Sequence, residues 1–137
     1  IATVIYDPKR RALMLAHLGR HSTVVQLMSQ AVQYFVERGS QEKDLQIWMS
    51  PSITQKNYRM DYFDHTNDTN WHNFCRQTAD GIYLDMQGFN RSLAIQAGVS
   101  AENIFISPID TADNPNYFSH SSGDIGGRFV VVACMRY

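Results

Sequence analysis

Hydrophobic and polar positions alternate at the beginning of the chain, as they do in strands with one buried face. Residues 1–6 alternate in this way, and residues 12–17 (ALMLAH) form a second short apolar run. The segment between them, residues 7–10 (DPKR), has the composition of a turn. The pattern therefore predicts a β-hairpin over the first 17 residues.

Two later segments carry apolar residues at helical spacing. In residues 22–37 apolar positions recur every three or four residues, with Ser22 placed to cap the first turn and Gly39 to end the helix. A second helix is predicted to begin after Asp85, its N-cap, and to end at Gly98.

The remaining apolar runs are short and predict strands at residues 45–49, 103–107 and 128–135, the last (RFVVVACM) strongly buried. Residues 55–80 are polar and poorly periodic, which predicts a long loop with one short helix at residues 71–76. Strands and helices mix without strict alternation. This order favours an α+β fold over a doubly wound sheet.

Length and charge limit the classes of protein to consider. The 137 residues suit one domain, and the formal net charge of −1 comes without a basic stripe, so nucleic acid is not an expected partner. No apolar run approaches the ~18 residues of a membrane span, and no signal segment is evident, so no membrane association is expected. The chain begins at Ile1, without Met and inside an apolar run. We therefore expect residues 1–137 to be a single domain that lacks its N-terminal part.

The cysteines give a prediction about the compartment. Cys75 and Cys134 lie far apart without CxxC spacing, so neither a disulfide framework nor a zinc knuckle is predicted, and a reducing, cytoplasmic setting is expected. Both thiols are expected to be buried, as are Trp48, Met49 and Trp71.

His17 is the first candidate for chemistry. It ends a predicted strand and is followed by Gly19 and a predicted helix start, a position from which an imidazole can reach a metal or an anion. On spacing alone, a partly buried histidine with satisfied hydrogen bonds is the favoured interpretation of this position. Gly19 is expected because the turn requires glycine.

A second candidate lies near the C-terminus, where small polar residues and glycines precede the last predicted strand. Arg128 is placed to pair with a phosphate there, or else to occupy the edge of an ordinary polar hairpin. Ser119 and His120 are not expected to act as a nucleophile pair, because neighbours on an extended chain point to opposite faces.

A third group of potential ligands lies in the polar segment 55–80. Carboxylates and imidazoles suit calcium or zinc, but their spacing matches no recognised loop geometry. A solvated loop is the favoured interpretation for Asp61, Asp64, His65, Asp68 and His72.

Several segments in order resemble the laccase-domain family, which includes proteins described as multicopper polyphenol oxidoreductases, peptidoglycan editing factors and zinc-dependent purine nucleoside phosphorylases. Residues 16–22 (AHLGRHS) resemble the family motif AHAGWRG, and residues 49–60 (MSPSITQKNYRM) resemble LGPxIGPxxYEV. Residues 83–104 match the pattern YLDxxxxNRxxLxxxGVxxxxI. Near the C-terminus, residues 117–120 (YFSH) resemble FFSYR, and residues 126–128 (GGR) resemble TGR.

The resemblance covers essentially the whole chain and implies the C-terminal portion of the domain. The fold it implies is α+β, with layered mixed β-sheets flanked by helices, as in the cytotoxic-necrotizing-factor-like fold. It also implies a metal site of two histidines and one cysteine, of which His17 matches the last ligand. The other two ligands would lie upstream of Ile1.

This chain departs from the family pattern around the implied site. The Trp and Arg of AHAGWRG are replaced by Arg20 and His21, so Arg20 is expected to supply the cation. The family's usual Cys-Thr pair is Ile109-Asp110 here, and the Arg after FFSY is missing.

The activity implied by the resemblance is zinc-dependent phosphorolysis of a purine nucleoside, with adenosine deamination as a further activity. The metal would activate a water or phosphate oxygen. Arg20 or Arg128 would contact anionic oxygens, and Ser119 or His120 would line the pocket. Copper fits less well, because one His-His-Cys site is not the multi-copper array that oxygen reduction requires.

The alternative is a non-catalytic remnant of the family that binds a nucleoside, a cell-wall fragment or a protein partner. The changes at Arg20, His21 and Ile109 favour it, whereas the retained His17 and Arg128 favour the enzyme. In either case we expect a monomer whose small-molecule partners are a purine nucleoside and phosphate.

Overall fold

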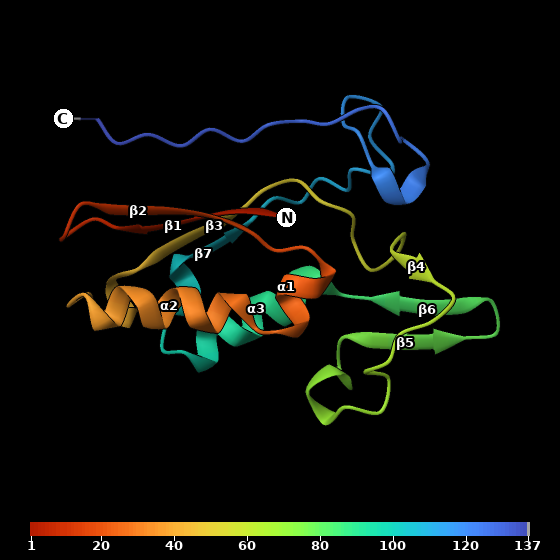
Figure 1. Ribbon diagram of the computed structural model, residues 1–137, viewed down its shortest axis with the longest axis horizontal. Helices are drawn as coiled ribbons and strands as arrows, with labels where there is room; N and C mark the ends of the chain where they lie inside the picture. The colour runs from red at the N-terminus through yellow and green to blue at the C-terminus, as the bar shows by residue number, and fades with distance from the viewer. Residues whose placement is uncertain (137) are drawn as a thin grey trace.

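The computed structural model describes residues 1–136 (Figure 1). Its central element is a four-stranded sheet of order β2-β1-β3-β7, formed by β1 (Ala2–Asp7), β2 (Ala12–His17), β3 (Gln46–Met49) and β7 (Ile104–Ile106). Strand β1 pairs antiparallel with both β2 and β3, and β3 pairs parallel with β7. The predicted hairpin and the strands predicted near residues 45–49 and 103–107 are confirmed.

Three α-helices cover one face of this sheet (Figure 1). They are α1 (Arg20–Val24), α2 (Leu27–Glu37) and α3 (Met86–Gln96). The prediction of one continuous helix over residues 22–37 is wrong. Gln26 has a left-handed backbone (φ 57°), which a helix cannot contain, so the chain turns between α1 and α2.

The helix ends were predicted with mixed success. Asp85 does cap α3, since its Oδ1 accepts a hydrogen bond of 2.8 Å from Gly88 N. Gly39 follows α2 with φ 88°, a conformation that favours glycine, as the sequence predicted. Ser22 is not an N-cap, because it lies inside α1, where its Oγ donates to His17 O at 2.8 Å.

A second sheet takes two of its three strands from the segment predicted to be a loop, residues 55–80. It contains β4 (Arg59–Met60), β6 (Gly81–Leu84) and β5 (Cys75–Thr78), in the order β4-β6-β5 with antiparallel pairing. The helix predicted at residues 71–76 is also wrong. Short 3₁₀ turns complete the described elements: Glu42–Asp44, Thr69–Trp71, Ala101–Asn103 and His120–Ser122.

The hydrophobic core lies between the helices and the inner face of the four-stranded sheet. Met49 and Trp71 are buried there as predicted, and Trp71 stacks on Phe89 with ring centroids 3.8 Å apart. Trp48 was predicted to be buried but is 38% exposed. Successive strand residues face opposite sides, so Trp48 points to the outer face while Met49 points inward.

The last segment of the chain runs along the outer face of the sheet (Figure 1). Residues 128–135 were predicted to be a buried strand, but the structure gives them no strand pairing, and Val130 and Val132 are 81% and 84% exposed. Cys134, predicted to be buried, is also exposed. A β-branched composition favours a strand only when a partner strand is available. Within residues 1–136, none of the helices combines the length and apolar character needed to cross a bilayer.

Candidate functional site

A cavity of about 380 Å³ opens between the end of β2, the loop after β3 and the loop near the C-terminus (residues 117–128), called the C-terminal loop below. Its volume lies within the ~300–1,000 Å³ of typical small-molecule sites. The lining contains all five residues proposed from the sequence, although they come from opposite ends of the chain: His17, Arg20, Ser119, His120 and Arg128.

His17 is the last residue of β2, where it pairs with Ala2 of β1. Partial burial of the ring in the cavity wall lowers its pKa below the ordinary value of 6.5. The imidazole is therefore neutral near pH 7, the form that binds a metal or accepts a hydrogen bond.

Gly19 has a different role from the one expected from the sequence. Its φ of −83° is open to any residue, so the turn itself does not require glycine. A Cβ at this position would lie 3.0 Å from His17 Nε2 and 3.4 Å from Cδ2. Gly19 therefore leaves space for the His17 ring to lie against the backbone.

Arg20 begins α1 and extends into the cavity lining beside Tyr58. Within the described part of the chain, no acidic side chain forms a salt bridge with Arg20, so its guanidinium charge is available to an anionic ligand. Burial raises the pKa of Tyr58, and the charge of Arg20 only partly opposes that shift. The Tyr58 hydroxyl thus keeps its proton near neutral pH and can donate a hydrogen bond into the cavity.

Tyr58, Ser52 and Thr111 also line the cavity and were not singled out from the sequence. Tyr58 and Ser52 belong to the segment at residues 49–60 that resembles a family motif, which was a usable signal. Thr111 follows Asp110 in a loop, and nothing in its sequence context indicated a site.

The C-terminal loop supplies the other side of the cavity. Ser119 is buried, and its backbone N donates a hydrogen bond of 2.8 Å to Asp124 Oδ2. The next residue, His120, is exposed and begins a short 3₁₀ turn. Arg128 Nη1 donates to Gly127 O at 2.6 Å, so part of this guanidinium holds the loop itself.

Gly127 is the tightest point of this loop. A Cβ added there would lie 2.0 Å from Phe118 Cδ1 and 2.4 Å from two other ring carbons. Only glycine therefore leaves room for the Phe118 ring in this position, next to the backbone in the cavity lining.

The residues present do not complete the implied zinc site. His17 and His120 both line the cavity, but no group of three His, Cys, Asp or Glu side chains comes together anywhere in residues 1–136. A catalytic zinc takes three protein ligands. In the polar segment, Asp68 instead accepts a hydrogen bond of 2.9 Å from Asn70 N and caps a 3₁₀ turn.

The fold and these motifs agree with a comparison against known families. A family model described as multi-copper polyphenol oxidoreductase laccase matches residues 1–136, and the chain belongs to this laccase-domain family. The expected family and its α+β fold are thereby confirmed.

Relatives of known name or structure support the same family. The chain is 30% identical over 129 residues to the purine nucleoside phosphorylase YlmD of Bacillus subtilis (strain 168), an alignment that covers 88% of this chain and 46% of the relative. The crystal structure of the hypothetical protein YfiH of Bacillus licheniformis matches with a TM-score of 0.79 and 26% identity, covering 88% of this chain and 48% of that one. YlmD of Geobacillus stearothermophilus matches in fold, with a TM-score of 0.77, 24% identity and the same coverages. The chain thus spans about half the length of the relatives it matches.

Proposed function

We propose that the cavity around His17 binds a purine nucleoside and phosphate, as part of the site of a nucleoside phosphorylase. The observation that carries this proposal is the convergence of Arg20 and His17 with Ser119, His120 and Arg128 in one cavity. The name of the Bacillus subtilis relative, a purine nucleoside phosphorylase, supplies the substrate class.

The lining offers complementary groups for both ligands. Arg20 supplies a cation for phosphate, and Arg128 adds a second at the mouth of the cavity. The aromatic side chains Tyr58 and Phe118 suit a purine ring, while Ser119 suits a ribose hydroxyl. In phosphorolysis a phosphate oxygen bonds to the ribose C1′ as the bond from C1′ to the base breaks, and the base leaves with a proton. A cation beside the attacking phosphate positions it for this step.

Zinc belongs to the proposal only through His17. The described residues supply too few ligands for a catalytic zinc, so none of the steps above is assigned to the metal. If zinc assists the reaction or an accompanying adenosine deamination, at least one further ligand lies outside residues 1–136.

The proposal is tested by calorimetric titration of the 137-residue chain with inosine and with inorganic phosphate. Arg20→Ala should weaken phosphate binding by about tenfold or more, since it removes a charge-assisted contact. Arg38→Ala is the matched control, because Arg38 lies over Tyr34 on α2, outside the cavity lining, and should stay within about twofold of wild type. Equal effects of the two substitutions, or a wild-type chain that binds neither ligand, would contradict the proposal.

A second candidate is a protein that binds the nucleoside without converting it. The replacement of the family's Trp and Arg by Arg20 and His21 after Gly19 favours this candidate. Release of hypoxanthine from inosine and phosphate, measured with and without added zinc, separates the two. Binding without release under both conditions favours the non-catalytic protein.

A further inference from the structure

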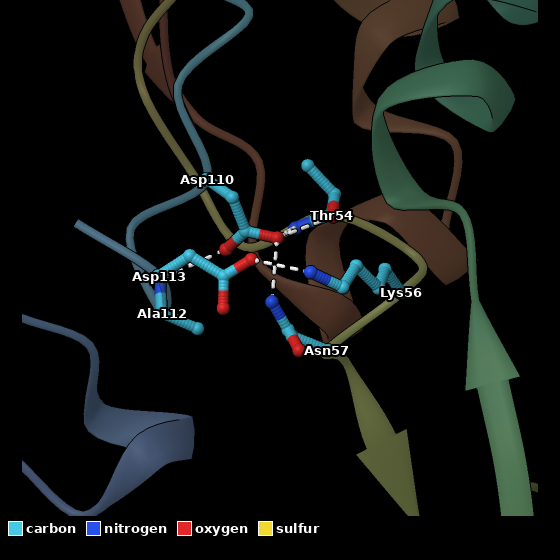
Figure 2. Close-up of polar contacts among 6 residues, drawn as sticks. All are labelled: Thr54, Lys56, Asn57, Asp110, Ala112 and Asp113. Carbon is cyan, nitrogen blue, oxygen red and sulfur yellow. Dashed lines mark hydrogen bonds and ion pairs between the residues drawn. The ribbon is translucent and has the colours of Figure 1, made fainter.

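Asp110 joins the two loops that border one side of the cavity. Its carboxylate accepts hydrogen bonds from both the backbone N (3.2 Å) and the Oγ1 of Thr54, from Asn57 Nδ2 (3.0 Å) and from Ala112 N (2.8 Å). Figure 2 shows these contacts, with the Asp110 carboxylate lying between Thr54 and Asn57. The residues Asp110, Thr54, Asn57 and Ala112 are called the Asp110 cluster below.

Main-chain contacts bring the same two loops together. Ser52 N donates to Ile109 O at 3.3 Å, and Thr111 N donates to Ser52 O at 3.1 Å. Ser52 and Thr111 both line the cavity. An ion pair of 2.9 Å between Lys56 and Asp113 lies beside the cluster, with both side chains largely exposed, and Asp113 also interacts with Asn57.

Thr54 connects the cluster to Tyr58. The Thr54 carbonyl accepts hydrogen bonds from Asn57 N at 3.1 Å and from Tyr58 N at 2.9 Å, which closes the turn of residues 54–58. Thr54 therefore donates to Asp110 through its N–H and hydroxyl, and it accepts a hydrogen bond from the Tyr58 backbone through its carbonyl. Tyr58 then lies in the cavity wall.

The charge state of Asp110 agrees with this arrangement. Burial alone would raise its pKa, but the hydrogen bonds from Thr54, Ala112 and Asn57 outweigh it and lower the pKa below 3.8. Asp110 is therefore ionised near neutral pH and can accept every bond directed at it. A threonine, which the family pattern usually has here, offers a single oxygen and can accept fewer of these bonds.

We propose that Asp110 is a positioning residue of the cavity: through Thr54 it fixes the turn that holds Tyr58 in the wall, and so preorganises the ring and hydroxyl that meet the nucleoside. This assignment rests on the proposed function for the ligand, while the placement of Tyr58 can be measured without a ligand. On this proposal, Asp110, which replaces the threonine that the family usually has here, helps to shape the site.

The test compares four variants of the 137-residue chain. Asp110→Ala and Thr54→Val remove the contact from either side, whereas Thr54→Ser keeps the hydroxyl. Asp113→Ala is the control, because it removes a neighbouring carboxylate that pairs with Lys56 and interacts with Asn57, while the hydrogen bonds of Thr54 go to Asp110. The readouts are the NMR signal of the Tyr58 ring, assigned with Tyr58→Phe, and the Kd for inosine.

We expect Asp110→Ala and Thr54→Val to shift the Tyr58 ring signal and to weaken inosine binding by about tenfold, with Thr54→Ser and Asp113→Ala within about twofold of wild type. A folded Asp110→Ala chain with unchanged Tyr58 signal and Kd would overturn the proposal. If Asp110→Ala does not fold, Thr54→Val decides in the same way. If the wild-type chain binds no inosine, the proposed function fails. In that case a Tyr58 shift in Asp110→Ala but not in Asp113→Ala still supports the positioning role, and no shift overturns it.

Discussion

The two sides of the cavity are held very differently. On the side formed by the end of β2 and α1, Leu18 is 1% exposed, and Thr23 Oγ1 accepts a hydrogen bond of 2.9 Å from Asn90 Nδ2 on α3. On the other side, the C-terminal loop carries Ile125 at 81% exposure and Phe118 at 50%. One side belongs to the core, and the other is held mainly by hydrogen bonds within the loop.

This difference indicates which side of the cavity is rigid and which side adjusts to a ligand. His17 and Arg20 are fixed by a hairpin and a helix start whose neighbours are buried, so their positions should hardly depend on a ligand. Segments with few buried apolar contacts open at a lower free energy than the core does. The C-terminal loop is therefore the side expected to adjust when a ligand binds, and substitutions in it should affect binding more than folding.

The largest expected effect comes from Leu18→Ala, on the core side. Leu18 is almost fully buried, so truncation removes apolar contacts and leaves a cavity, at a cost of about 2–5 kcal/mol in the free energy of unfolding. Urea denaturation followed by circular dichroism measures this cost. Ile125→Ala is the control on the opposite side and should stay within about 0.5 kcal/mol of wild type. Equal losses in the two variants would remove the contrast between the sides.

A smaller effect is expected from Gly127→Ala, at the tight point of the C-terminal loop. The added Cβ overlaps the Phe118 ring, so the ring must move or the backbone must shift, at a cost of about 1–3 kcal/mol. Gly126→Ala is a neighbouring control, because nothing lies within 4 Å of a Cβ placed there. Thermal denaturation and inosine titration of both variants check the difference. A Gly127→Ala chain that melts and binds like Gly126→Ala would show that Phe118 is not held against the backbone.

The Asp110 cluster gives a pH-dependent prediction for the loops between the two sides. Asp110→Asn keeps the shape but turns an NH₂ group toward the donor of Ala112 or toward those of Thr54 and Asn57, at an expected cost of about 1–2 kcal/mol near pH 7. The folded-state pKa of Asp110 is lowered, so its stabilising contribution is present above the ordinary value of 3.8 and is lost as the pH falls through the lower folded value. The gap between wild type and Asp110→Asn, measured by urea denaturation from neutral to acid pH, should therefore close in acid. A gap of constant size would contradict an ionised Asp110.

The parts of the fold that sequence predicted well are those with local signals. The hairpin at residues 1–17 has two alternating runs around a turn, and Asp85 and Gly98 mark the two ends of α3. The second sheet was missed because its strands have only two to four residues, too few to show the alternation that reveals a strand, and because β5 is largely polar. Gln26 breaks the first helix through a left-handed backbone that no periodicity indicates.

The residues of the site also divide into those with a local sequence signal and those that depend on tertiary contacts. His17, Arg20 and Arg128 could be proposed from motifs, and the structure brings them to one cavity. The contribution of Asp110 could not be predicted, because it depends on a contact with Thr54 across 56 residues of sequence. The burial of residues 128–135 was overestimated for a related reason. Their composition indicates that they can form a strand, but it does not show whether a neighbouring strand is available to pair with them.

The smallest expected effect concerns the two thiols and extends the comparison beyond the C-terminal loop. Cys134 is exposed in the segment that follows that loop, whereas Cys75 is half-buried in β5, where burial raises its pKa. Because the thiolate is the reactive form, Cys134 should react with Ellman's reagent in a fast phase and Cys75 about tenfold or more slowly. Cys134→Ser should abolish the fast phase with little change in the melting temperature. If Cys134→Ser abolishes the slow phase instead, Cys134 is shielded from solvent. The weak packing of this side of the molecule would then be confined to the C-terminal loop.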